Sequence, residues 1–352
     1  MATRAVRSWL RERPGVLVCA LVLALSVATV YDQFRGLIPI SPGANPHAFV
    51  EQNQVARNRG VLRGEGGDPW KYRVASEWLA SQARRIARAA GFHEPAVAGF
   101  LAFRVLQNAA IFGLAWLLYR RLGLSRYASV LGLGLIAWAM TQALLNSGLA
   151  FDTYGDVVVY LAAALLILSR RYAWVVPLAA IGALNRDTSG LVPILLIAWA
   201  VPLGLRTPEG RRVARLGLAA LAAFAATTVA LRVAAGPGDL ILPYGRHPGW
   251  QLFEYNFGRG QTWDQLFRTL TVLPLLALWS FRRWPLSLRV LGVALVPAWL
   301  TIHAFGAVLQ ETRLLLVPYV LILVPGALIG LVEGESQAPE NSVVRHPADS
   351  CA

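Results

Sequence analysis

The chain has 352 residues, of which 56% are hydrophobic and 15% charged, and its formal net charge is +14. A mean hydropathy of +0.50 excludes an ordinary soluble domain. The positive charge could indicate a nucleic-acid partner, but the arginines form short clusters between apolar segments, as in the cytoplasmic loops of membrane proteins. We therefore expect a membrane protein with no nucleic-acid partner. Cys19 and Cys351 supply neither a disulfide framework nor a zinc site.

The N-terminal segment combines positive charge with a first apolar run. Arginines precede the run from Val16 to Val30, which predicts a cytoplasmic N-terminus and an outward-going span. A cleavable signal peptide is the alternative, because Ser26 and Ala28 are small residues at a suitable spacing. Cleavage would leave the topology of the rest unchanged. The arginines concerned are Arg4, Arg7, Arg11 and Arg13.

Nine further apolar segments predict an all-α, polytopic transmembrane bundle of about ten spans. The short loops between them carry arginine and all fall inside when the spans are threaded in order, which predicts two cytoplasmic termini in the inner (plasma) membrane. We expect one transmembrane domain, residues 1–332, and a disordered cytoplasmic tail, residues 333–352. The segments are Ala96–Leu118, Ala128–Leu145, Val157–Leu168, Ala173–Leu184, Leu191–Leu205, Leu216–Ala234, Leu270–Phe281, Leu286–Phe305 and Leu314–Leu331.

Two long connections, residues 31–95 and 235–268, are expected outside, because long loops translocate largely regardless of their charge. In the first, apolar residues from Val74 to Ala90 recur at helical spacing, with Trp78 and Ile86 among them. This pattern predicts a helix that lies along the outer interface with its apolar side toward lipid.

The polar signatures of the chain all fall on the predicted outer side. Asp152 and Asp156 are four residues apart, so on a helix they share a face that suits a metal, a general base or an acceptor sugar. Alternatively, both are loop and cap residues before Val157. Arg186 could hold a phosphate while Asp187 orients it or accepts a proton; the alternative is a local ion pair and a helix cap.

Three further signatures have structural alternatives of the same kind. Glu311 and Arg313 begin the last span and either pair with each other or line a cavity. Arg104 lies well inside its span, where an unpaired cation costs about 2.5 to 3.5 kcal/mol, so it must snorkel, pair or bind an anion. Lys71 and Arg73 lie among aromatic residues, which suits a lipid phosphate, a sugar face or an aromatic interface belt.

The segments Phe49 to Gly60 and Gly67 to Arg73, followed by Trp78, resemble the first external loop of polyprenol-dependent GT-C membrane glycosyltransferases. The residues from Asn185 to Thr188, and Glu311 to Arg313 with the prolines that follow, are similar to patterns in uncharacterised bacterial members. The acidic residue that the family carries early in this loop has several candidates here, namely Asp32, Glu51, Glu65 and Asp68.

The resemblance implies transfer of a sugar from a polyprenyl-phosphate-linked donor to an external acceptor hydroxyl. Asp68 or Asp152 would take the acceptor proton, with Asp187 as a further acid, and arginines would neutralise the departing lipid phosphate. The sequence leaves a divalent cation open as a cofactor and predicts no protein metal site. The arginines in question are Arg73, Arg104, Arg186 and Arg313.

Other functions stay open at this stage. A transporter or flippase for lipid-linked sugars would place polar residues on both sides of the midplane and show repeat symmetry. An O-antigen polymerase or ligase-like enzyme would depend more on a large external loop near the later spans, for which residues 235–268 are the candidate. A non-catalytic subunit of a membrane assembly is a further alternative.

Overall fold

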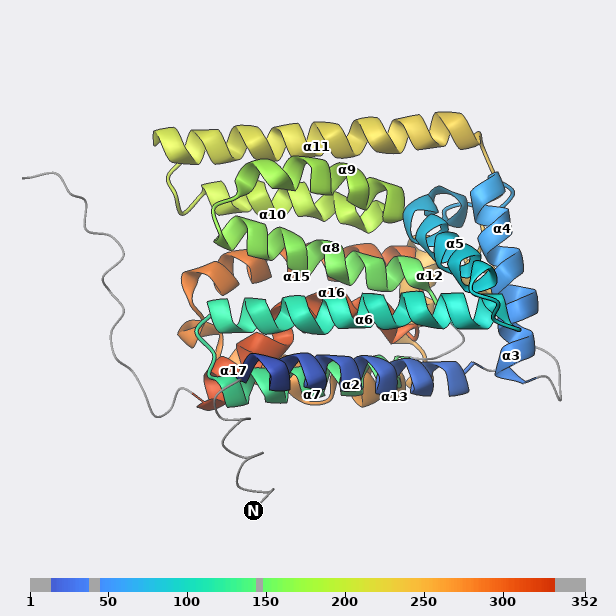
Figure 1. The fold of residues 1–352 in the computed structure, drawn as a ribbon. Coiled ribbons are helices and arrows are strands. Elements are labelled where there is room, and N and C mark those ends of the chain that lie inside the picture. The colour runs from blue at the N-terminus through green and yellow to red at the C-terminus, as the bar shows by residue number, and fades with distance from the viewer. Residues whose placement is uncertain (1–13, 38–44, 144–147, 333–352) are drawn as a thin grey trace, which may run out of the picture.

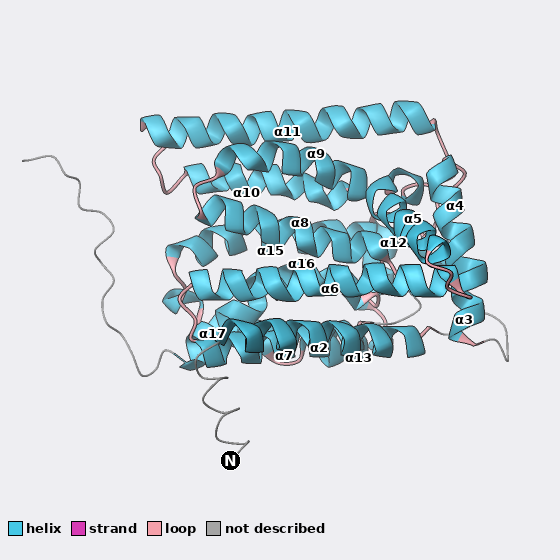
Figure 2. Cartoon of the chain, viewed as in Figure 1, coloured by secondary structure: helices cyan, strands magenta, loops and turns pink. Residues whose placement is uncertain are grey.

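The computed structural model describes residues 14–37, 45–143 and 148–332, and helices dominate these parts of the chain (Figures 1 and 2). Within them there is no strand, and the only β-bridge is an isolated one between Asp68 and Leu240. The prediction of an all-α fold is confirmed. The four N-terminal arginines and the predicted tail lie outside the described residues.

The main body of the protein is a bundle of helices that run side by side, with α11 along one outer edge and α2 and α7 along the opposite one (Figure 1). Helix α6 lies between α2 and α8, and α11 packs on α9 and α10. The bundle contains α2 (Pro14–Arg35), α6 (Pro95–Arg121), α7 (Arg126–Gln142), α8 (Phe151–Leu168), α9 (Val175–Asn185), α10 (Leu191–Ala200), α11 (Pro208–Ala235), α14 (Leu273–Trp279), α15 (Leu286–Gly306), α16 (Leu316–Pro318) and α17 (Val324–Val332).

Several shorter helices lie at one end of this bundle, where α4 and α5 run across the helix ends (Figure 1). Both come from the first long connection, which is therefore largely helical. The short helices are α3 (Pro46–Phe49), α4 (Val55–Arg63), α5 (Val74–Ala89), α12 (Trp250–Phe257) and α13 (Gly260–Leu270).

Among the residues that the structure describes, six segments are long and apolar enough to cross a membrane, as expected of a multi-spanning membrane protein. They are α2, α6, α8, α11, α15 and the nearly continuous helical segment Thr312–Leu331. Helices α9 and α10 are apolar but short, and the count of ten spans stays a prediction.

Two of the predicted segments have different boundaries in the structure. Helix α8 begins at Phe151 rather than at Val157, so Asp152 and Asp156 lie inside the helix and are not loop residues before it. The segment Leu270–Phe281 is not a single span: α13 ends at Leu270 and α14 has only 7 residues. At about 1.5 Å per residue, α14 cannot cross a bilayer alone.

The two ends of the bundle differ in composition. The loops after α6, α8 and α10 meet at one end, here called the arginine-loop end, and the starts of α6 and α8 lie at the other, beside α5 (Figure 1). All short-loop arginines used to predict topology are at the arginine-loop end, as that prediction requires. Those in or beside the loops after α6, α8 and α10 are Arg120, Arg121, Arg126, Arg170, Arg171, Arg206, Arg211, Arg212 and Arg215. Arg282, Arg283 and Arg289 flank the turn before α15, where Arg283 donates to the carbonyl of Gly330 near the end of α17.

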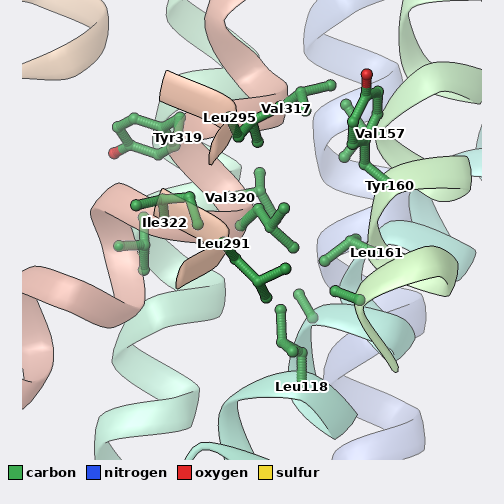
Figure 3. Packing of buried hydrophobic residues seen from close by; sticks show 14 of the residues in the cluster. Leu118, Val157, Tyr160, Leu161, Leu291, Leu295, Val317, Tyr319, Val320 and Ile322 are labelled. Atoms are coloured by element: carbon green, nitrogen blue, oxygen red, sulfur yellow. The ribbon is translucent and has the colours of Figure 1, made fainter. Parts of the chain in front are cut away.

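The core lies where α8, α15 and the segment Thr312–Leu331 meet, with α6 and α7 beside them (Figure 3). Tyr160 packs edge-on against Trp299 at 5.3 Å between ring centres. The hydroxyl of Tyr119 donates to the carbonyl of Val320 at 2.8 Å. The indole N–H of Trp299 donates to the carbonyl of Leu314 at 2.8 Å. Both groups are thus paired inside the bundle, where an unpaired hydroxyl or indole N–H would be costly.

Helix α5 confirms the helix expected between Val74 and Ala90. It packs closely on α6, where a Cβ on Gly99 would lie 2.5 Å from the Cα of Arg84, so only glycine permits this approach. Ala80 and Ala87 are buried on this side, while Trp78 and Ile86 are 54% and 69% exposed on the other. An apolar face of α5 is therefore left for the surroundings of the protein, as the prediction of an interfacial helix requires.

The contact between Trp284, just before α15, and Gly326 of α17 gives a test of the helix packing. A Cβ on Gly326 would lie 2.3 Å from the indole ring of Trp284. The carbonyl of Gly326 accepts hydrogen bonds from the Ser280 hydroxyl at 2.6 Å and from the Trp284 indole N–H at 3.1 Å. Gly326→Ala should therefore destabilise the protein by roughly 1–3 kcal/mol, measured by thermal unfolding in detergent. The matched control is Gly134→Ala, where a Cβ meets nothing within 4 Å. Equal unfolding temperatures for the two variants would contradict the packing described.

Candidate functional site

A group of buried and partly buried charged residues lies at the end of the bundle opposite the arginine-loop end. It is called the polar cluster below. Its members come from α4, α5, α6, α8 and the turns before α5, α10 and α16, so most of the fold contributes to it. The polar cluster consists of Arg57, Arg73, Glu77, Arg104, Asp152, Arg186 and Arg313.

Asp152 is the centre of the polar cluster. It lies in the first turn of α8 and is only 2% exposed. Its carboxylate accepts a bond from Arg73 Nη1 at 2.7 Å and a longer one from Arg57 Nη2 at 3.5 Å. Arg186 and Arg313 lie within the electrostatic range of the same carboxylate. Asp152 therefore holds the guanidinium groups of α4 and of the turn before α5 at the start of α8.

Glu77 is a second buried acid that the sequence analysis missed. It lies on α5, is 1% exposed, and accepts a bond from Asn58 Nδ2 at 2.8 Å. Arg57 Nε is 3.9 Å from its other carboxylate oxygen, which has no hydrogen-bond partner. Burial raises the pKa of Glu77 above its usual value, although Arg57 and Asn58 oppose the shift. A helical wheel would have found it, because Glu77 lies on the side of α5 away from Ile86.

Arg104 is buried inside α6, at 1% exposure. Its Nη1 donates to Gln107 at 3.1 Å, and its guanidinium lies 3.7 Å from the ring centre of Tyr154. The hydroxyl of Tyr154 in turn accepts a bond from Gln33 of α2 at 2.7 Å. Of the sequence alternatives, snorkelling is thereby excluded, since the guanidinium points into the protein. Its neighbours supply hydrogen bonding and a cation–π contact, but not a carboxylate in contact.

The turn between α9 and α10 is held in place from α8. Asp156 accepts hydroxyl bonds from Thr188 and Ser189, both at 2.6 Å, so it organises this turn. Asn185 donates to the carbonyl of Asp152 at 2.8 Å. The consequence is a fixed position for Arg186, whose Nη1 donates to the hydroxyl of Thr153 at 3.1 Å.

Asp187 and Glu311 flank the polar cluster. Asp187 is half exposed and lies 3.7 Å from Arg232 of α11, with Arg73 within its electrostatic range. Glu311 accepts a hydrogen bond from Arg313, so the predicted local pair exists. The structure thus brings together Asp152, Arg73, Arg104, Arg186 and Arg313, with Asp156, Asp187 and Glu311 around them.

Asp68 lies outside the polar cluster, in a set of contacts that joins the two long connections. Its N–H donates to the carbonyl of Asp239 at 2.9 Å, and its own carbonyl accepts from Ile241 at 3.0 Å. Lys71 Nζ donates to the carbonyl of Gly236 at 2.6 Å and lies 3.3 Å from the Asp68 carboxylate. We call the contacts of residues 68–72 with residues 236–241 the loop latch. Asp68 therefore contacts the latch lysine rather than the arginines of the polar cluster.

Two arginines of the polar cluster stand out because they lack an acidic partner. Arg104 and Arg186 are 1% and 5% exposed, and within the described parts of the chain no carboxylate oxygen lies within 4.0 Å of either. The Nε atom of each is buried without a hydrogen-bond partner there. Asp152 and Asp156 act on these arginines only from beyond contact distance. A buried guanidinium with no carboxylate in contact is costly, so this end of the bundle is suited to receive an anion.

The described residues contain no group of three or more His, Cys, Asp or Glu side chains that could hold a metal ion. Comparison of the chain with protein-family models, with curated proteins and with solved structures found no match.

Neutralising Asp152 and neutralising Glu77 should change the stability of the protein in opposite directions. Asp152→Asn leaves the guanidinium of Arg73 without its contacting carboxylate and removes one of the two carboxylates beside Arg57, so it should cost about 3–5 kcal/mol. Glu77→Gln should be at least as stable as the wild type at neutral pH, because burial disfavours the ionised acid. Both effects can be measured as unfolding midpoints in detergent.

The pH dependence of Glu77→Gln has a defined sign. Because the folded-state pKa of Glu77 is raised, the wild type loses stability as pH rises from about 4.3, the usual pKa of glutamate, through the folded value. The advantage of Glu77→Gln should therefore grow with rising pH and vanish at acidic pH. A Glu77→Gln protein that is less stable than the wild type at pH 8 would contradict this assignment.

Proposed function

We propose that the protein is a membrane glycosyltransferase that moves a sugar from a polyprenyl-phosphate-linked donor to an acceptor hydroxyl on the outer face of the membrane. The observation that carries the proposal is the pair of buried arginines, Arg104 and Arg186, that lack acidic partners. A lipid phosphate is an anion that reaches such a site from the bilayer, and a guanidinium presents donors that match its oxygens.

The proposed reaction needs one base and one leaving-group site. The acceptor oxygen forms a bond to the anomeric carbon of the sugar, and the bond between that carbon and the phosphate oxygen breaks. The phosphate leaves with the electron pair and is neutralised by Arg104 and Arg186, and the acceptor proton passes to a carboxylate. No other co-reactant is required.

Glu77 suits the role of base better than the acids chosen from sequence. Its raised pKa and its carboxylate oxygen without a hydrogen-bond partner favour proton uptake. Asp152 is already paired with Arg73 and Arg57, so we assign it the positioning of those arginines. Asp187, half exposed beside Arg232, is assigned to the acceptor side.

The location of the charged residues favours a transferase over a flippase. The polar cluster lies at one end of the bundle, whereas transporter sites are typically near the membrane midplane between repeats. In the proposed topology the chain crosses the inner membrane about ten times in a GT-C-like arrangement, with both termini in the cytoplasm and the polar cluster outside. An O-antigen polymerase or ligase-like enzyme would use the same donor chemistry and differ in its acceptor.

Donor binding is tested with a matched pair of lipids. The purified full-length protein should unfold at a higher temperature with undecaprenyl phosphate than with undecaprenol, which lacks only the phosphate. Arg186→Ala and Arg104→Met should abolish this difference, because each removes a phosphate partner. Arg63→Ala, an exposed change in the last turn of α4, should retain it. A wild type that responds equally to both lipids would overturn the assignment of a phosphate site.

Transfer is tested in membranes supplied with polyprenyl-phosphate-linked glucose that is radiolabelled in the sugar. We expect Glu77→Gln to lower the rate of label transfer by about 10²- to 10⁴-fold, the usual contribution of a general base. Arg63→Ala again serves as the control and should transfer at the wild-type rate. Undiminished transfer in a correctly folded Glu77→Gln protein would remove Glu77 from the mechanism.

A further inference from the structure

The arginine-loop end carries a groove that has no part in the proposed function. It lies between the last turns of α6 and α8 and has a volume of about 600 Å³, within the range of small-molecule sites. Its apolar lining is aliphatic, and its lining at the helix ends is basic. The lining comprises Leu114, Leu117, Ala162, Leu165 and Leu166 in the wall, with Arg120, Arg121, Ser169 and Arg171 at the rim.

The arginines at this rim are not neutralised by the protein. Arg120 donates to the carbonyl of Leu124, and Arg121 Nη2 donates to the carbonyl of Leu168 at 3.2 Å, so both use carbonyls as partners. Over residues 14–37, 45–143 and 148–332, no carboxylate oxygen lies within 4.0 Å of Arg120, Arg121 or Arg171. The rim is therefore a concentrated positive charge over an apolar channel.

Two neighbouring grooves extend this surface. One of about 940 Å³ lies between α2 and α6 and shares Leu114, Leu117 and Arg120 with the first. Another of about 390 Å³ shares Leu166 and Arg171, and includes the exposed ring of Trp174. Two apolar channels thus lie on either side of α6, and Arg120 belongs to the rim of both. This arrangement suits a ligand with one charged head group and two hydrocarbon chains.

We propose that these grooves bind an anionic diacyl phospholipid of the leaflet at the arginine-loop end, with its phosphate at Arg120, Arg121 and Arg171 and one acyl chain on each side of α6. Charge complementarity selects the anionic head group, and the aliphatic walls select the chains. Basic pockets between transmembrane helices are known to take such head groups. The site is independent of the polar cluster, which lies at the other end of the bundle.

The proposal predicts a lipid preference that depends on two of the rim arginines. Full-length protein in detergent should bind dioleoylphosphatidylglycerol more tightly than dioleoylphosphatidylcholine, measured by the rise in unfolding temperature across a lipid titration. Each arginine near a phosphate contributes about a fivefold factor in affinity, so Arg120→Gln with Arg171→Gln should reduce the preference roughly 25-fold. Arg121 is left unchanged because it also caps α8.

The matched control changes the same charge at the same end of the bundle. Arg211 and Arg212 are exposed at the start of α11, outside the grooves. Arg211→Gln with Arg212→Gln should retain the wild-type preference for phosphatidylglycerol. An equal loss in both double variants would mean that only net charge matters and would overturn the site.

A second variant tests the acyl channel separately from the rim charge. Ala162→Trp fills the groove between α6 and α8 and should weaken binding of dioleoylphosphatidylglycerol while leaving all arginines in place. Inorganic phosphate at the same concentration should not raise the unfolding temperature, because it has no chain to bury. A response to inorganic phosphate as large as that to the lipid, or unchanged lipid binding by Ala162→Trp, would overturn the proposal.

Discussion

The ion pair between Asp152 and Arg73 is the interaction on which the arrangement of the polar end depends. A carboxylate that is almost fully buried at the start of a span requires a counter-charge, because its desolvation costs several kcal/mol. Arg73 supplies it from the segment that leads into α5, and Arg57 adds a second contact from α4. The need to neutralise one acid thereby draws the first long connection down onto the helix bundle.

The same requirement explains why the remaining cations matter. Asp152 is shared by Arg73 and Arg57, and Asp156 is used by the hydroxyls of the turn that precedes α10. Arg104 and Arg186 are then left with hydroxyl, amide and aromatic neighbours. An anion site is therefore indicated by the buried arginines that contact no carboxylate. The arginines that contact one form a network that stabilises the fold.

Local signals in the sequence predicted much of this organisation. Apolar runs separated by arginine loops located most of the helices and their alternating direction, and the turn around Arg186 was expected where it is found. Burial depends on tertiary contacts, so Glu77 and Arg57 were not recognised on helices that look like surface helices. Asp68 was chosen as a candidate for the acidic residue that the resembled family carries in its first external loop, but its backbone pairs with the second long connection.

The loop latch connects α11, the outermost helix, to the polar end of the bundle. Helix α11 contacts the bundle along one side only, yet Arg232 in its last turn lies over the ring of Tyr72, which directly precedes Arg73. Lys71 holds the carbonyl of Gly236, just beyond the end of the same helix. A rotation or axial slip of α11 would therefore pull on the backbone beside the guanidinium that neutralises Asp152. Any displacement of α11 along its axis must therefore be accommodated at the loop latch, within two residues of the arginine that pairs with Asp152.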